Sequence, residues 1–100
     1  MDTSPLKLIT IVAEPVLEDR IAAAIKSLGA RGYNISSVHG EGSRGMRASE
    51  VPGDSVRIET VVSAAVADRI LSHIAEHYFP RYAVIAYVSD VGVVRGEKYV

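Results

Sequence analysis

The chain has 100 residues, of which 48% are hydrophobic and 23% charged, a composition typical of a soluble globular domain and unlike that of a disordered chain. Eleven Lys and Arg residues against twelve Asp and Glu residues give a formal net charge of -1, which argues against general binding to nucleic acids or acidic membranes. The absence of cysteine excludes disulfides and thiolate metal sites, and no apolar run is long enough to span a bilayer, so we expect one cytoplasmic domain over residues 1–100.

The first part of the chain alternates between strand and helix patterns. Residues 6–13 form a short segment rich in β-branched side chains, which predicts a strand. Pro15 then opens a predicted helix in which apolar residues recur every three or four positions up to Leu28. Gly29 stands where a C-cap glycine belongs, and after a short turn residues 33–39 predict a second strand.

The second part repeats this order. Residues 56–62 alternate as a third strand, and Ser63 is a good N-cap for the helix that follows. Residues 82–88 predict a fourth strand, and the tail is expected to add a short edge strand around residues 93–94. The core face of the second helix is expected to comprise Val66, Ile70, Leu71, Ile74 and Tyr78.

The resulting order, β-α-β-β-α-β, is that of a ferredoxin-like α+β sandwich. In this fold both helices cover one face of a four-stranded antiparallel sheet, and a monomer would keep the other face polar. Residues 6–13 and 82–88 are instead apolar on both faces. We therefore expect another subunit to cover the second face.

A long irregular segment, residues 40–55, joins the second and third predicted strands. Loops of this length inside a compact domain are usually functional or disordered. The segment begins Gly-Glu-Gly-Ser-Arg-Gly, which matches G-x-G-x-x-G, but a dinucleotide-binding loop would lead into a helix and this one leads into a strand. Backbone amides at the glycines, the Ser43 hydroxyl and two arginines, Arg44 and Arg47, nevertheless suit a phosphate group. A hairpin loop with solvated charges is the alternative.

Residues 73–77, His-Ile-Ala-Glu-His, match the H-x-x-E-H signature of the inverzincin peptidases. The spacing puts His73 and His77 on one face of the predicted helix. That face lies opposite the predicted core residues, and only a short tail remains to supply a further ligand. We therefore expect solvated surface histidines and no metal site.

Three segments, residues 29–33, 40–47 and 78–87, resemble the PII-like signalling proteins, in the branch associated with carboxysomes and bicarbonate transport. The G-x-G-S-R-x-x-R stretch is the most specific of them, and the resemblance spans nearly the whole chain. It implies a homotrimer with a long T-loop over residues 40–55 and with adenine nucleotides bound in clefts between subunits. It also implies no enzymatic activity and no required cofactor. The resemblance implies instead that the protein regulates a partner protein in inorganic-carbon metabolism, such as a bicarbonate transporter or a carboxysome component.

The resemblance further implies the ligands and the residues that meet them. We expect AMP, ADP or cyclic AMP rather than ATP, because the second phosphate loop of the family is reduced here to residues 79–81, and bicarbonate is a second candidate ligand. The T-loop contains no tyrosine, so uridylylation is not expected. The residues that the resemblance assigns to the nucleotide are Asn34, Gly40, Glu41, Gly42, Ser43, Arg44, Arg47, Glu59, Val61, Arg95 and Gly96.

Two alternatives to a nucleotide sensor stay open at this point. The CutA-type metal-tolerance proteins share the fold and the trimer, and would imply a metal-binding protein. A small enzyme of the ferredoxin-like fold is the other. A metal-binding cleft would need several clustered ligands, and His39 is the only histidine near the loop.

Overall fold

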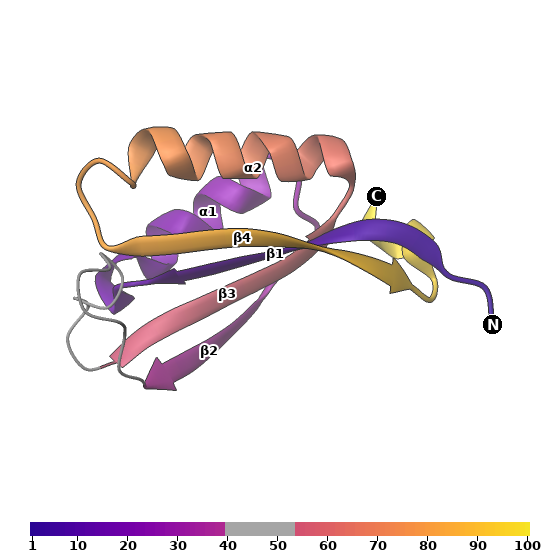
Figure 1. Cartoon of the computed structure of the whole chain (residues 1–100), viewed down its shortest axis with the longest axis horizontal. Helices are drawn as coiled ribbons and strands as arrows, with labels where there is room; N and C mark the ends of the chain where they lie inside the picture. The colour runs from indigo at the N-terminus through magenta and orange to yellow at the C-terminus, as the bar shows by residue number, and fades with distance from the viewer. Residues whose placement is uncertain (40–53) are drawn as a thin grey trace.

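The computed structural model describes residues 1–39 and 54–100, and in it four antiparallel strands form one sheet with two helices on one face (Figure 1). The strands run in the spatial order β2-β3-β1-β4. Their bounds are β1 Ser4–Ala13, β2 Asn34–His39, β3 Asp54–Val62 and β4 Val84–Val93. The helices are α1 Glu18–Ser27 and α2 Ala64–His77, with single 3-10 turns at η1 Pro15–Leu17 and η3 Gly96–Tyr99. The predicted β-α-β-β-α-β fold is confirmed.

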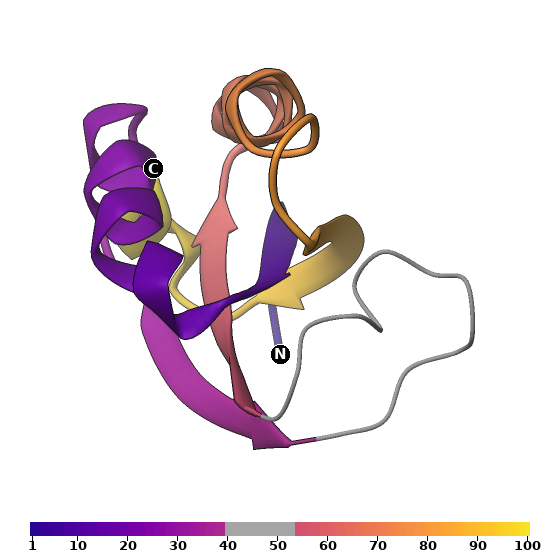
Figure 2. The same ribbon diagram turned by 90° about the vertical axis from the view of Figure 1, so that its left-hand side faces the viewer.

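The core lies between the helices and one face of the sheet, and viewed from its end the molecule shows both helices on the same side (Figure 2). β1 and β3 present alternate residues to this core, and the helices present residues three and four apart. The fully buried side chains are Ile9, Ile11, Ala13, Ile21, Ile25, Ile58, Val62, Ile70 and Ile74. Ala67, only 2% exposed, belongs to this core although only larger residues were expected on that face of α2.

The second face of the sheet carries no helix, and we call it the open face. Its apolar residues are the half-buried Leu8, Val12, Val61 and Ile85 together with Tyr87, whose exposed fraction is 49%. The pairing register places them on one side, because directly opposed residues in a sheet point the same way. The expectation that the first and fourth strands, β1 and β4, carry apolar residues on both faces is therefore confirmed.

Two predicted caps form as expected. The Ser63 side chain accepts a 3.3 Å hydrogen bond from the backbone N–H of Val66 at the start of α2. Gly29 follows α1 with a φ of +123°, a conformation that L-residues with a side chain rarely adopt. Pro15, by contrast, opens a 3-10 turn, and the α-helix begins only at Glu18.

The prediction of a separate edge strand around residues 93–94 is wrong. β4 instead continues to Val93, because β1 extends beyond the end of β3 and its first residues pair with β4, Ser4 with Val93. Lys7 and Asp90 form an ion pair along this extension. The chain then turns into η3.

The third strand also begins earlier than the predicted loop boundary. Asp54 and Ser55 belong to β3, where they pair with His39 and Val38 of β2. The Nδ1 atom of His39 lies 3.1 Å from a carboxylate oxygen of Asp54. Within the described part of the chain, neither helix is long and apolar enough to cross a membrane.

Candidate functional site

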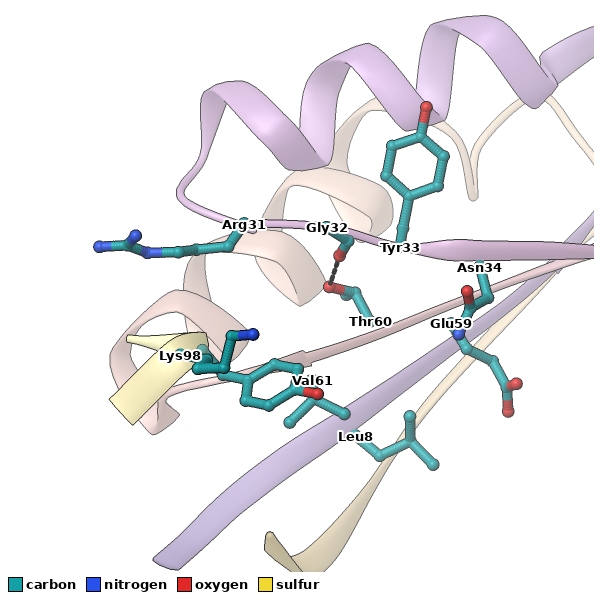
Figure 3. Close-up of a pocket in the computed structure, with 10 residues that line it drawn as sticks. Leu8, Arg31, Gly32, Tyr33, Asn34, Glu59, Thr60, Val61 and Lys98 are labelled. Carbon is teal, nitrogen blue, oxygen red and sulfur yellow. Dashed lines mark hydrogen bonds between the residues drawn. The ribbon is translucent and has the colours of Figure 1, made fainter. Parts of the chain in front are cut away.

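A hollow of about 490 Å³ opens where the start of β2, the open face of β3 and the C-terminal turn η3 meet (Figure 3). Its volume lies within the range of about 300–1,000 Å³ that is usual for small-molecule sites. Its lining consists of Leu8, Arg31, Gly32, Tyr33, Asn34, Glu59, Thr60, Val61, Lys98 and Tyr99.

Three of the residues predicted to meet a nucleotide line this hollow together. Glu59 and Val61 are alternate residues of β3 and therefore share the open face. The register pairs Asn34 with Glu59 and Leu8 with Val61. Figure 3 shows the side chains of Asn34 and Glu59 side by side. The sheet thus brings an amide, a carboxylate and two apolar side chains onto one surface.

The wall of the hollow is the turn that leaves α1. The hydroxyl of Thr60, a residue only 3% exposed, donates a 2.6 Å hydrogen bond to the carbonyl oxygen of Gly32. At the other end of the turn, the backbone N–H of Ala30 donates to the carbonyl of Ile25 at 3.0 Å. Because the turn is held to both β3 and α1, this wall is formed without a ligand.

The charges of the hollow are two cations, Arg31 and Lys98, and one carboxylate, Glu59. Guanidinium and ammonium groups bind phosphate oxygens, and a carboxylate can accept hydrogen bonds from ribose hydroxyls. Leu8, Val61 and the aromatic ring of Tyr99 are apolar surfaces on which a planar base can pack. The arrangement can therefore hold a ligand that combines a planar ring, hydroxyls and an anion.

Two of the remaining predicted residues, Arg95 and Gly96, do not line the hollow. Arg95 precedes η3 with a φ of 64°, and Gly96 is buried against Ser4, so both act at the base of η3. Six others lie outside the residues that the structure describes, namely Gly40, Glu41, Gly42, Ser43, Arg44 and Arg47. The roles of all eight in binding stay predictions.

Sequence reasoning did not assign seven of the residues that line the hollow, namely Leu8, Arg31, Gly32, Tyr33, Thr60, Lys98 and Tyr99. Arg31 stands in a segment that carries the family resemblance, but its position gave no hint of a ligand. Thr60 belongs to the predicted strand over residues 56–62, but nothing in the sequence marked it as part of a site. Lys98 and Tyr99 reach the hollow because the tail forms η3 rather than an edge strand, and nothing local in the sequence distinguishes the two outcomes.

The second predicted feature, the histidine pair, lies on α2, on the other layer of the molecule. The ring centroids of His73 and His77 are 4.4 Å apart. His77 is exposed as expected, but His73 is half-buried, because its ring packs beside that of Tyr78 with centroids 6.0 Å apart. Burial, and next the charge of His77, lower the pKa of His73 below its ordinary value. Over residues 1–39 and 54–100, no group of three or more His, Asp or Glu side chains is placed to hold a metal ion.

Comparison with known proteins adds independent evidence. Residues 6–98 match the family described as nitrogen regulatory protein P-II. A PII-like signaling protein from Thermus thermophilus is 59% identical to this chain, with both chains fully covered and a TM-score of 0.86.

More distant structures share the fold. CPII from Thiomonas intermedia K12, bound to ADP, AMP and acetate, is 20% identical over 99% of this chain and 98% of its own, with a TM-score of 0.86. CPII bound to ADP and bicarbonate is 23% identical over the same shares, with a TM-score of 0.83.

Proposed function

Because this chain belongs to the nitrogen regulatory protein P-II family, we propose that it is a non-enzymatic, cytoplasmic signalling protein that binds adenine nucleotides and regulates a partner protein. One observation carries this proposal. The hollow beside β3 brings together Asn34, Glu59 and Val61, which the family resemblance independently assigns to the nucleotide, and adds the cations Arg31 and Lys98. This is the combination of groups that a nucleotide needs.

We propose that the whole chain is one domain and assembles into a homotrimer through the open face. The support is the apolar surface of Leu8, Val12, Val61, Ile85 and Tyr87, which a monomer would leave in water. Since Leu8 and Val61 also line the hollow, a neighbouring subunit on this face would close the hollow into a cleft. Light scattering at micromolar concentration should give the mass of three 10.7 kDa chains. A monomeric mass would contradict the trimer.

Each group in the hollow has a role in this proposal. Leu8 and Val61 pack against adenine and Glu59 accepts hydrogen bonds from the ribose hydroxyls, while Arg31 and Lys98 add positive charge that favours an anionic ligand. The residues between β2 and β3 act as the T-loop, with Gly42, Ser43, Arg44 and Arg47 making the phosphate contacts. The preferred ligands are AMP, ADP or cyclic AMP rather than ATP, because the second phosphate loop of the family is reduced here to residues 79–81.

We further propose that bicarbonate is a second ligand and that the partner acts in inorganic-carbon metabolism. The motive is the family resemblance together with the CPII structure that holds ADP and bicarbonate. If both ligands favour the same state of the T-loop, each must strengthen the binding of the other by the same factor.

Calorimetric titration with AMP, ADP, ATP and cyclic AMP, with and without bicarbonate at fixed pH and ionic strength, tests the proposal. Glu59→Gln should weaken the binding of the preferred nucleotide, whereas the matched control Glu76→Gln, on the exposed side of α2, should not. No binding of any of the four nucleotides would overturn the nucleotide proposal. Equal nucleotide affinities with and without bicarbonate would contradict the proposal that bicarbonate is a second ligand.

A further inference from the structure

The last two turns of α2 carry a pair of imidazoles that the nucleotide site does not use. His73 and His77 are one helical turn apart, and their ring centroids are 4.4 Å apart. His73 is steadied by the neighbouring Tyr78 ring, and His77 projects into solvent. The His73 ring is therefore held by packing, whereas the His77 ring can change its orientation.

Neither ring is engaged elsewhere in the described part of the chain, where no hydrogen bond or ion pair involves His73 or His77. A neutral imidazole offers one nitrogen lone pair. Hollows of about 430 and 380 Å³ flank the pair and share His73, Glu76 and His77 as lining residues. Open space that can hold an ion and its waters therefore borders both rings.

We propose that His73 and His77 form a binding site for a divalent late transition-metal ion, Cu²⁺, Ni²⁺ or Zn²⁺. Metal–imidazole bonds of about 2.0–2.1 Å require the two nitrogens to lie within about 4 Å of each other, and rings 4.4 Å apart reach this with small side-chain rotations. Imidazole nitrogen suits these ions better than it suits Mg²⁺ or Ca²⁺. Water supplies the other ligands, because no third protein ligand is in place among the described residues.

The charges around the pair permit a cation. The carboxylate of Glu76 lines both hollows and adds negative charge. Two cations, Arg20 and Arg81, line the larger hollow, and the Arg20 guanidinium donates to the Tyr82 hydroxyl at 3.3 Å. The smaller hollow has two carboxylates, Asp68 and Glu76, and one cation, Arg69, which donates to the carbonyl oxygen of Leu28 at 3.3 Å. The smaller hollow is therefore the side from which we expect the ion to enter.

Titration of metal-free protein with Zn²⁺ and with Cu²⁺ near pH 7.5 tests the site. The wild-type chain should bind one ion per subunit. His73→Asn and His77→Asn should each weaken binding at least about tenfold, because the second imidazole binds as an intramolecular ligand. The remaining histidine of the chain, His39, provides the matched control, and His39→Asn should leave the affinity unchanged. The copper spectrum should show two nitrogen ligands in the wild type and one in either variant.

Wild-type affinity in both α2 variants would overturn the site, as would equal loss in His39→Asn. Far-UV circular dichroism checks that the variants keep their helices. Titration of His77→Asn with ADP separates this proposal from the nucleotide site, since ADP binding should be unchanged whether or not metal binds.

Discussion

Thr60 on β3 and Gly32 in the turn after α1 are joined by a 2.6 Å hydrogen bond, from the threonine hydroxyl to the glycine carbonyl oxygen (Figure 3). Thr60 points to the helix side of the sheet, whereas its neighbours Glu59 and Val61 point to the open face. The bond therefore holds the turn that forms the wall of the hollow against β3, the strand whose residues Glu59 and Val61 line the hollow.

Thr60→Val should lower the free energy of unfolding by about 0.5–1.5 kcal/mol, since it removes this bond with little change in volume. It should also weaken ADP binding, because the turn that carries Arg31 is released from β3. Thr60→Ser keeps the hydroxyl and is the matched control for the hydrogen bond. Urea unfolding and calorimetry measure the two effects. Equal ADP affinity in Thr60→Val and the wild type would show that the bond serves stability alone.

Gly96 is predicted to be required for packing. A Cβ atom at this position would overlap the Cβ of Ser4, at the start of β1. Gly96→Ala should therefore destabilise the chain and displace η3, and with it Lys98 and Tyr99 from the hollow. Overpacking of this kind typically costs about 1–3 kcal/mol.

Ser4→Gly in the same chain should recover part of that loss, because it removes the atom in the way. Thermal unfolding of the single and double variants gives the coupling between the two positions. Additive effects would place the cause of the Gly96→Ala defect elsewhere, and would leave a direct contact between Gly96 and the nucleotide as the explanation of any lost binding.

The sequence predicted the strands and helices because their patterns are local. The alternation in residues 56–62 and the helical spacing of Ile70 and Ile74 recur in the structure. The end of β4 was not predictable in this way. Ser89, Asp90 and Gly92 favour turns locally, and they lie in a strand only because the start of β1 pairs with them.

Three residues of the site were predictable through the family resemblance, which assigns them to the nucleotide. Asn34, Glu59 and Val61 belong to strands whose register follows from the fold. Lys98 and Tyr99 could not be placed, because their position depends on how the tail turns after Val93.

The prediction that Arg44 and Arg47 bind phosphate rests on the sequence alone. Arg47→Ala should weaken nucleotide binding by about 1.5–3 kcal/mol, the usual range for hydrogen bonds to charged groups. Arg44→Ala should act in the same direction. Lys26→Ala, which removes an exposed cation from α1, is the control for a change in net charge. Unchanged affinity in both arginine variants would exclude them as phosphate ligands.

Because of His73, the free energy of unfolding should depend on pH below 6.5, the ordinary pKa of a histidine side chain. Burial and then the charge of His77 lower its pKa in the folded chain, while Glu76 acts in the opposite direction. The unfolded chain therefore binds the proton more readily, so His73 lowers stability as the pH falls from about 6.5 through its folded-state pKa. The other charged groups lining the two adjacent hollows are Arg20 and Arg81 in one and Asp68 and Arg69 in the other.

The comparison is between the wild type and His73→Gln, unfolded in urea at pH 7 and pH 5 with a chelator present. The wild type should lose more stability than the variant between the two pH values. Parallel losses would mean that His73 titrates alike in the folded and unfolded chains.

A crystal structure of the protein with saturating ADP tests the central claim most directly. We predict a trimer with ADP in the hollow, its adenine against Leu8 and Val61, its ribose hydroxyls at Glu59 and its phosphates toward the T-loop, with the neighbouring subunit closing the cleft. ADP bound away from Asn34, Glu59 and Val61, or an empty hollow in crystals grown at saturating ADP, would contradict the account.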